Sequence, residues 1–377
     1  MATLSGWAPV LIEILEYLAV LITIIFVHEY GHFIVGRWCG VKVETFSIGF
    51  GPELFSFHDR KGTRWRAALI PFGGYVKFFG DPNAASTQDP NALGALTPAE
   101  RAVSLGGQSL AKRAAIVAAG PIFNFILAFV IFSSLLYVNG RYIMMPRVGE
   151  VVADSAAAAA GLKSGDIVRS IDGEKIETFS DMVQIVTLSS GVPLKFVVER
   201  AGTTVDLTVT PRTEEVDSPA GRQRAGRIGV TASRDRADQQ HVQYDFLQAL
   251  AGGASDTIGV VTGSIAGIQA MISGRVGTDQ ISGPVEIATA TGNIARTFGL
   301  SGLLALIAIL SASVGFANLL PIPILDGGHL MFFALEAIKR GPLSQRFQER
   351  GSMVGALIIA CLIFFVIFNS LHRYVMK

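Results

Sequence analysis

Four long apolar stretches dominate the pattern of hydrophobic and polar positions along this chain of 377 residues. Each approaches or reaches the roughly 20 apolar residues that an α-helix needs to cross a bilayer. A fifth stretch, 249–273, contains Asp256 and many small polar residues, which is typical of an interfacial or partly buried helix. We therefore predict a polytopic α-helical membrane protein with about four transmembrane helices, which cover approximately residues 10–35, 114–138, 299–320 and 353–371.

Composition and charge favour the same class of protein. Hydrophobic residues make up 50% of the chain and charged residues only 16%, and the mean hydropathy is +0.47, which is too apolar for an ordinary soluble protein. The formal net charge of +1 offers no basic excess, so we expect the lipid bilayer as a partner and no nucleic acid. The first stretch lacks a basic n-region and a small-residue cleavage site, which favours a membrane span over a signal peptide.

Lysine and arginine predict the orientation of the spans. They gather between the first two spans and again after the third, and short loops rich in these residues stay in the cytoplasm. Both termini and the long segment between the second and third spans should then be extracytoplasmic, although His372, Arg373 and Lys377 count mildly against this. The basic residues in the two loops are Arg37, Lys42, Arg60, Lys61, Arg64, Arg66, Lys77, Arg101, Lys112 and Arg113, and then Lys339, Arg340, Arg346 and Arg350.

Residues 141–241 have a mixed composition that predicts an inserted extracytoplasmic α+β domain. A helical pattern at 179–189 lies among strand-like runs, with Asp172-Gly173 and Ala201-Gly202 at the turns. Residues 213–241 indicate a solvated linker or a strand excursion. The run AGLKSGDIV…IDG and the order of elements resemble a bacterial PDZ domain with its core at 146–212, a fold that binds extended peptide ends. A small sheet domain that acts only as a plug or spacer is the alternative.

The first cytoplasmic loop is unusually rich in aromatic residues and glycine, in the runs FSIGFGPELFSF and RWRAALIPFGGYVKFFGD. Such runs predict a re-entrant β-hairpin at the membrane face of the protein, since backbone without helical hydrogen bonds is tolerated there only inside protein or beside a wet cavity. Gly73 and Gly74 would let another backbone approach closely. A loop packed over the cytoplasmic ends of the spans is the alternative.

The first span contains His28-Glu29-Tyr30-Gly31-His32, an HExxH motif. The apolar surroundings require a helix, because no other local structure satisfies the backbone there. The two histidines then share one face and can bind one zinc ion, while Glu29 can hold and deprotonate a water. The alternative, a polar face that lines a helix bundle, is disfavoured because ionisable groups inside a membrane are costly and usually functional.

A catalytic zinc ion needs a third protein ligand and keeps one position for water. In ANLLPIPILDGGHL, residues 317–330, Asp326 follows a break in the third span at Pro321 and Pro323. Its carboxylate can reach the first span, although Asp326 could instead cap the helix that begins near 328. His329 is a competing ligand.

Four features together resemble the site-2 protease family of intramembrane zinc metalloproteases: HEYGH, NLLPIPILDGG, the PDZ-like domain and PFGGYVKFFGD. The resemblance covers nearly the whole chain. It implies His28, His32 and Asp326 as ligands of one catalytic zinc ion, with Glu29 as the catalytic residue. It also implies that the substrate is held by Asn318, for which an interhelical hydrogen bond is the alternative, and is received as an extended strand by Gly73, Gly74, Tyr75, Val76 and Lys77.

The bacterial branch of this family cleaves anti-sigma factors in stress responses and removes remnant signal peptides. The resemblance therefore implies an endopeptidase of the bacterial cytoplasmic (inner) membrane that cuts single-span proteins after another protease has shortened them. Members from enteric bacteria carry two tandem PDZ domains, whereas this chain has room for one. The expected organisation is 1–140 with two spans and the hairpin, 141–241 with the PDZ-like domain and linker, 242–297 as a helical segment, and 298–377 with two further spans.

Two functions from other classes remain open at this point. A metal-dependent transporter could place the same three ligands at mid-membrane, but such proteins usually show internal repeats, and none is found here. A membrane-tethered PDZ adaptor could hold a structural zinc ion. Neither alternative needs a general base beside the metal, so Glu29 distinguishes them from a protease.

Overall fold

The computed structural model describes residues 7–81, 94, 96–218, 221–275 and 283–375. The chain divides into two compact units, Met1–Phe132 with Thr291–Lys377, and Ser133–Ala290. The helices α4 (Leu110–Asn139) and α8 (Pro284–Leu319) each continue from one unit into the other.

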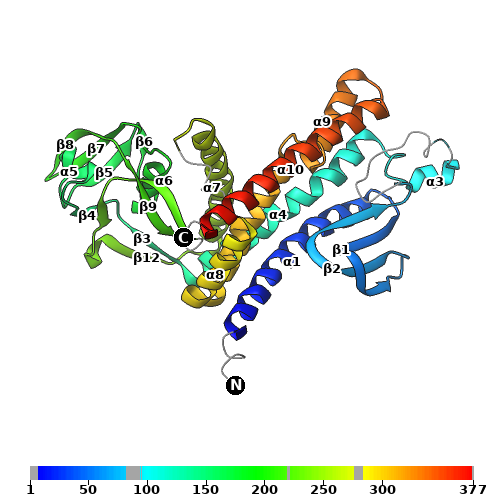
Figure 1. Cartoon of the computed structure of the whole chain (residues 1–377), viewed down its shortest axis with the longest axis horizontal. Helices are drawn as coiled ribbons and strands as arrows, with labels where there is room; N and C mark the ends of the chain where they lie inside the picture. The colour runs from blue at the N-terminus through cyan, green and yellow to red at the C-terminus, as the bar shows by residue number, and fades with distance from the viewer. Residues whose placement is uncertain (1–6, 82–93, 95, 219–220, 276–282, 376–377) are drawn as a thin grey trace. The chain divides into compact units, whose positions relative to one another are not determined.

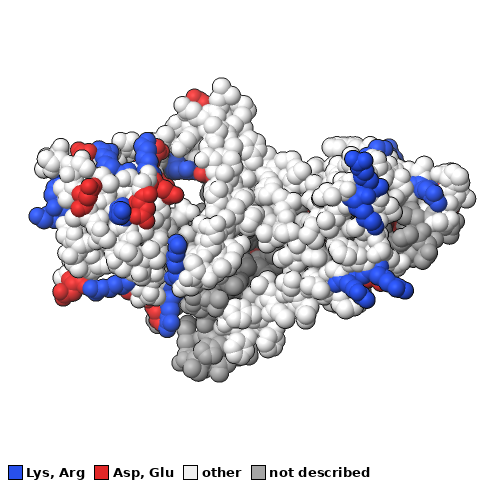
Figure 2. All heavy atoms as spheres, turned by 90° about the horizontal axis from the view of Figure 1, so that it is seen from above, with Lys and Arg blue, Asp and Glu red and all other residues white. Residues whose placement is uncertain are grey.

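Four long helices form the framework of the first unit: α1 (Trp7–Trp38), α4, α8 and α10 (Gln345–Val375) (Figure 1). Each contains a stretch that is long and apolar enough to cross a membrane, at Leu11–Trp38, Leu110–Asn139, Pro284–Leu319 and Gln345–Ser370. Figure 2 shows charged side chains gathered in some parts of the face drawn, and a broad part of this face almost without them. The prediction of four apolar helices is confirmed.

The helix α8 begins earlier than the sequence pattern predicts. The prediction placed a separate helical segment at 242–297 and the third span from 299, but α8 starts at Pro284 and passes through Gly299, whose backbone (φ 60°, ψ −146°) is not helical. Glycine adopts such a conformation without the steric cost that a Cβ imposes. The predicted start of the span thus coincides with a break between two helical pieces of one element.

The two strands β1 (Val43–His58) and β2 (Arg64–Phe78) form a sheet beside α1 (Figure 1). Residues 43–48 pair with residues 74–78 and also with residues 64–67, and residues 53–58 pair with residues 64–68. Among the described strands, the segment 74–78 therefore pairs on one side only, which makes it an edge of this sheet. Strands are present where the hairpin is predicted, and its re-entry into the membrane stays a prediction.

One face of this sheet packs against α1. Phe46, Val76 and Phe78 are buried together with Phe33 of α1. Other parts of the two strands expose large apolar side chains, namely Leu54, Phe55, Leu69 and Ile70. Part of the sheet is therefore packed against α1, and part of it is apolar and exposed.

A polar cluster fastens the turn of the hairpin to the end of α1. The Arg37 guanidinium donates to the carboxylate of Asp59 and to the Thr63 hydroxyl, and it lies 4.3 Å from the centre of the Phe33 ring. Burial would raise the pKa of Asp59, but hydrogen bonds from Trp65, Thr63 and Arg37 hold it at about 2. The charged form of Asp59 is thus the form that this anchor stabilises.

The second unit is built around a four-stranded antiparallel sheet in the order β6-β5-β7-β8. The strands are β5 (Ile167–Ile171), β6 (Glu174–Lys175), β7 (Leu194–Arg200) and β8 (Thr203–Val209), and the helices α5 (Ala156–Ala159) and α6 (Phe179–Thr187) pack with them. The core side chains Val168, Ile171, Phe196, Val198 and Val209 are fully buried.

Two predicted turns of this domain are confirmed. Asp172 and Gly173 (φ 49° and 88°) join β5 to β6, and Ala201 and Gly202 (φ 50° and 80°) join β7 to β8. Positive φ at both central positions is what a type I′ hairpin turn requires. The predicted helix at 179–189 is present as α6.

The described part of 213–241 contains residues of four strands, so the strand alternative is right and the linker alternative is wrong. The strands β9 (Arg212–Ser218) and β10 (Gly221–Arg227) pair with each other, β11 (Val230–Ala232) pairs with β4 (Val148–Val151), and β12 (Gln239–Val242) pairs with β3 (Arg141–Met144). Ile228 is part of the buried core. The folded domain therefore extends from Arg141 to Val242, and its kinship with PDZ domains stays a prediction.

The predicted partly buried helix at 249–273 is present as α7 (Phe246–Ile272). A capping box between Asp245 and Gln248 begins it, and Asp256 forms an ion pair with Arg141 of β3. Its buried positions include small residues such as Ala249 and Gly253. The polar residue that argued against a membrane span thus has a partner within the same unit.

Candidate metal centre

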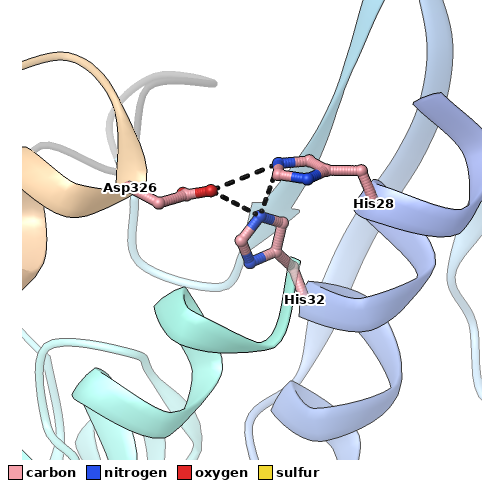
Figure 3. Close-up of side chains that lie close together, drawn as sticks. All are labelled: His28, His32 and Asp326. Atoms are coloured by element: carbon pink, nitrogen blue, oxygen red, sulfur yellow. Dashed lines mark hydrogen bonds and ion pairs between the residues drawn. The ribbon is translucent and has the colours of Figure 1, made fainter. Parts of the chain in front are cut away.

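The two histidines of the HExxH motif project from one face of α1 toward Asp326 (Figure 3). The carboxylate oxygen Oδ2 of Asp326 lies 3.2 Å from Nε2 of His28 and 3.5 Å from Nε2 of His32. The two Nε2 atoms are 3.3 Å apart. One turn of helix separates the histidines, as the i, i+4 spacing predicts, so α1 alone positions two of the three side chains.

Asp326 lies at the start of α9 (Asp326–Lys339), just after the segment that joins this helix to α8. Asp326 is the first residue of α9, the preceding Leu325 occupies the cap position, and no side chain caps the helix. The alternative in which Asp326 serves as a helix cap is therefore wrong. Ile324 has a φ of 97°, which is a strained conformation for a β-branched residue and marks a sharp reversal of the chain just before the carboxylate.

The residues fit a zinc ion. Among the described residues, His28, His32 and Asp326 form a group whose three ligand atoms all lie within 4.8 Å of one another. Oδ2 of Asp326 is buried and accepts no hydrogen bond from a described residue, which is costly for a carboxylate unless a cation completes it. Two imidazoles and a carboxylate are typical ligands of a catalytic zinc ion. His329 lines the same cavity but does not belong to this group.

Helix α4 packs directly against the two imidazoles. Nδ1 of His32 donates to the backbone carbonyl of Ile116 at 2.9 Å, and this tautomer leaves the lone pair of Nε2 for a metal. A Cβ at Gly120 would lie 2.2 Å from Nε2 of His32 and 2.9 Å from Cε1 of His28. Glycine is required at residue 120, because any side chain there would displace both ligands.

Glu29 lies between the metal group and the β-sheet. It lines a cavity of about 220 Å³ together with His28, His32, Gly74, Tyr75, Val76 and Asn318, and the cavity continues to Glu336 and Gln348. A Cβ at Gly74 would lie 2.9 Å from Cγ of Glu29 and 2.7 Å from the carbonyl oxygen of Ser47. The sheet edge therefore reaches the glutamate only because Gly74 has no side chain.

Two of the predicted substrate-binding residues lie away from this cavity lining. Gly73 has a φ of 123°, and a side chain there would meet the Phe50 ring. Lys77 forms an ion pair with Glu44 at 3.0 Å. The structure thus brings Gly74, Tyr75, Val76 and Asn318 to the cavity and leaves Gly73 and Lys77 outside its lining.

Sequence reasoning missed two polar contributions to the site. Asn124 of α4 lies with its side chain next to Nδ1 of His28, and a lone amide within an apolar span was the available signal. Arg113 donates to the buried carboxylate of Glu336 at 2.8 Å and so ties the start of α4 to α9, the helix that carries Asp326. Their partners are more than 90 residues away in sequence, so no local spacing could have indicated them.

Comparisons with known proteins agree with this geometry. The family model for peptidase family M50 matches residues 16–362. A protein of Agrobacterium fabrum named as a candidate zinc metalloprotease is 46% identical over 363 residues, which cover 96% of each chain. A similarly named protein of Mesorhizobium japonicum is 44% identical over 95% of this chain and 98% of its own. A metalloprotease of Caulobacter vibrioides is 38% identical over 98% of this chain and 97% of its own.

The matched family spans both histidines and Asp326, and the three relatives match almost the full length of this chain. The geometry of two imidazoles and a carboxylate beside a glutamate is what zinc-dependent peptide hydrolysis needs. The chain therefore belongs to peptidase family M50, the site-2 protease family, and is a zinc metalloprotease.

Proposed function

We propose that this metalloprotease cuts single-span membrane proteins within or near their membrane-spanning helix. The observation that carries this proposal is the shared cavity, in which the metal group, Glu29 and an edge strand meet at helices apolar enough to cross a membrane. A peptidase for soluble substrates would have no need of such a setting, because buried ionisable groups are costly.

The chemistry follows from the residues in the cavity. His28, His32 and Asp326 would hold the zinc ion, which supplies Lewis acidity that makes a water acidic and polarises a carbonyl. As the oxygen of the water bonds to the carbonyl carbon, Glu29 takes one proton from this water. Glu29 then gives this proton to the amide nitrogen as the carbon–nitrogen bond breaks, which leaves a carboxylic acid and an amine. The second proton of the water then passes from the acid to the amine, so the products are one carboxylate and one ammonium group.

The sheet edge at 74–78 supports binding of the substrate as a strand. A helical peptide bond is shielded by its own hydrogen bonds, so the substrate must unwind locally before water can attack. Pairing with an exposed strand edge replaces the lost hydrogen bonds. Asn318, at the end of α8 and in the same cavity, would hold the substrate backbone from the opposite direction.

The cellular setting proposed here is the bacterial cytoplasmic membrane, with both termini and the domain at 141–242 on the extracytoplasmic side. Substrates would be anti-sigma factors or remnant signal peptides that another protease has already shortened. The domain would exclude substrates that still carry a bulky outer part, or bind their new C-termini. The basic residues between the first and second apolar helices, and those at 339–350 before the last apolar stretch, support this orientation.

The test of the reaction compares the native chain with Glu29→Gln in liposomes that contain a shortened single-span substrate. We expect the cut to be lost by about 10² to 10⁴-fold, since that is the range of general acid–base contributions, with zinc retained. Glu16→Gln is the matched control, because Glu16 lies on the same helix outside the cavity lining. Mass spectrometry locates the cut, and a metal assay measures zinc.

Absence of a cut by the zinc-loaded native chain acting on a genuine substrate would favour the adaptor or the transporter.

The proposal that the domain filters substrates has its own test. Arg141 and Val242 are paired across adjacent strands, so the two ends of this segment lie close together. The chain can therefore be rejoined across the gap when 141–242 is removed. The protein without 141–242 should cleave an unshortened substrate faster than the native chain does. An unchanged preference for the shortened substrate would contradict the role of the domain as a filter.

A further inference from the structure

Helix α4 orients both histidine ligands, but through two different groups. Ile116, Gly120 and Asn124 follow one another at intervals of four residues, which places them along one face of the helix. The carbonyl of Ile116 holds His32, Gly120 makes room for both rings, and Asn124 faces His28. One stripe of α4 thus contacts the whole histidine pair.

We propose that Asn124 is the positioning residue for the zinc ligand His28, and that its carboxamide oxygen accepts the Nδ1–H of this ring. The inference rests on the proposed ligand set of His28, His32 and Asp326. Asn124 touches neither the zinc ion nor the substrate. It acts through the ring that it orients.

The contact between the two side chains is direct and buried. Asn124 is fully buried, and its carboxamide lies 3.3 Å from Nδ1 of His28. Its oxygen Oδ1 is buried and accepts no hydrogen bond from a described residue when the nitrogen faces the ring. Exchanging the nitrogen and the oxygen, which occupy equivalent positions, gives the oxygen a donor.

The metal decides between the two orientations. Coordination through Nε2 requires the lone pair there, so the single proton of the neutral imidazole must sit on Nδ1. A proton on Nδ1 can be accepted by the oxygen of Asn124 and not by its nitrogen. With the nitrogen facing the ring instead, the proton would sit on Nε2, toward Asp326, and block coordination.

The backbone of Asn124 is fixed from the other side by α8. The hydroxyl of Ser311 donates to the carbonyl oxygen of Asn124 at 2.9 Å. Gly315 brings α8 so close that a Cβ there would lie 3.3 Å from Cβ of Asn124. Ser311 therefore offers a matched control, because it contacts Asn124 without facing His28.

The experiment measures zinc affinity of the full-length protein in detergent, by equilibrium competition with a chromophoric chelator, for Asn124→Leu, Asn124→Asp, Ser311→Ala and His28→Ala. Loss of a partner that orients a ligand typically weakens metal binding by about 10 to 100-fold, and we expect this for Asn124→Leu, which has no acceptor. Asn124→Asp keeps an acceptor and should bind zinc at least as tightly as the native chain. The visible spectrum of the cobalt-loaded protein should change in the leucine variant and not in the aspartate variant.

Several results would overturn the proposal. If Asn124→Leu bound zinc as tightly as the native chain, no orienting hydrogen bond would be needed. If Ser311→Ala lost as much zinc affinity as Asn124→Leu, packing alone would account for the loss. A loss in Asn124→Asp would show that the ring needs a donor, and this variant decides the matter if the leucine variant does not fold. Zinc affinity that survives in His28→Ala would instead contradict the ligand set itself, so the two failures are distinguishable.

Discussion

The two sheets of this protein are held in opposite ways. The sheet of β5 to β8 buries Val168, Phe196 and Val209 in a core that its own domain closes. The sheet of β1 and β2 packs in part against α1 and exposes Leu54, Phe55 and Leu69 elsewhere. The β5–β8 sheet has a core of its own, whereas the β1–β2 sheet shares its core with α1.

The difference teaches what each sheet can be used for. The core of the β5–β8 sheet is closed by its own domain, and none of the described residues of this sheet lines the cavity at the metal group. The β1–β2 sheet instead takes its position from α1, through Phe33, Arg37 and the contact of Gly74 with Glu29. Its edge therefore has a fixed relation to Glu29.

The largest effect should come from opening the closed core. Phe196→Ala should lower the unfolding free energy of the domain by about 3–5 kcal/mol, the range for truncation of a buried aromatic side chain. Phe55→Ala, at a residue whose side chain is 63% exposed, should change stability by no more than about 0.5 kcal/mol. Hydrogen exchange of the full-length chain in detergent measures both. Similar losses of protection in the two variants would contradict the contrast between the sheets.

A smaller effect should come from pushing the attached sheet away from Glu29. Gly74→Ala places a Cβ against Cγ of Glu29 and the carbonyl oxygen of Ser47. A displacement of about 1 Å at a catalytic group can cost about 10²-fold in rate, so we expect that loss in turnover with zinc content unchanged.

The control for this variant is Gly173→Ala in the other sheet. Gly173 has a φ of 88° and open space around it, so alanine there should cost about 1–2 kcal/mol of stability through backbone strain and leave turnover intact. Full turnover in Gly74→Ala would show that the sheet can shift without disturbing the glutamate.

The smallest effect is a shared sensitivity to acid. Asp166 is paired with Arg200 in the domain, and although burial would raise its pKa, hydrogen bonds from Arg200 lower it. Asp59 has a pKa of about 2. Because both folded pKa values lie below the ordinary 3.8, their stabilisation is complete above that pH and is lost as the pH falls through the folded values.

Thermal unfolding between pH 7 and pH 2 measures this loss. These two carboxylates should not change the unfolding free energy of the native chain between pH 7 and about pH 5. Asp166→Asn should destabilise the domain more at pH 7 than at pH 2. An equal effect of the substitution at both pH values would contradict the ion pair as the cause.

Regular spacing made much of the fold predictable. The apolar stretches predict the four long helices. Asp172-Gly173 and Ala201-Gly202 predict two hairpin turns of the domain at 141–242. The sequence did not predict that residues 228–242 complete the domain, because β11 and β12 pair with strands more than 70 residues earlier. Pairing between distant strands leaves no local pattern beyond alternation, and these strands are short.

In the metal group, too, local spacing predicts some features and tertiary structure decides the others. The spacing of His28 and His32 dictates their shared face, whereas Asp326 and His329 could not be separated by spacing, since both follow the break at Pro321 and Pro323. The reversal at Ile324 decides where the carboxylate points. Asn124 and Gly120 matter only because α4 packs against α1, which is a fact of tertiary structure.

Burial of the metal group has a consequence for how the enzyme acquires its metal. The side chains of His28, His32 and Asp326 are only 13%, 12% and 16% exposed, so an ion can enter or leave only through the cavity. Exchange must then be slow compared with that of an open surface site, and a wrongly loaded ion would stay. Since copper binds such ligands more tightly than zinc at equilibrium, metal identity would be set by which ion is available while the helices assemble.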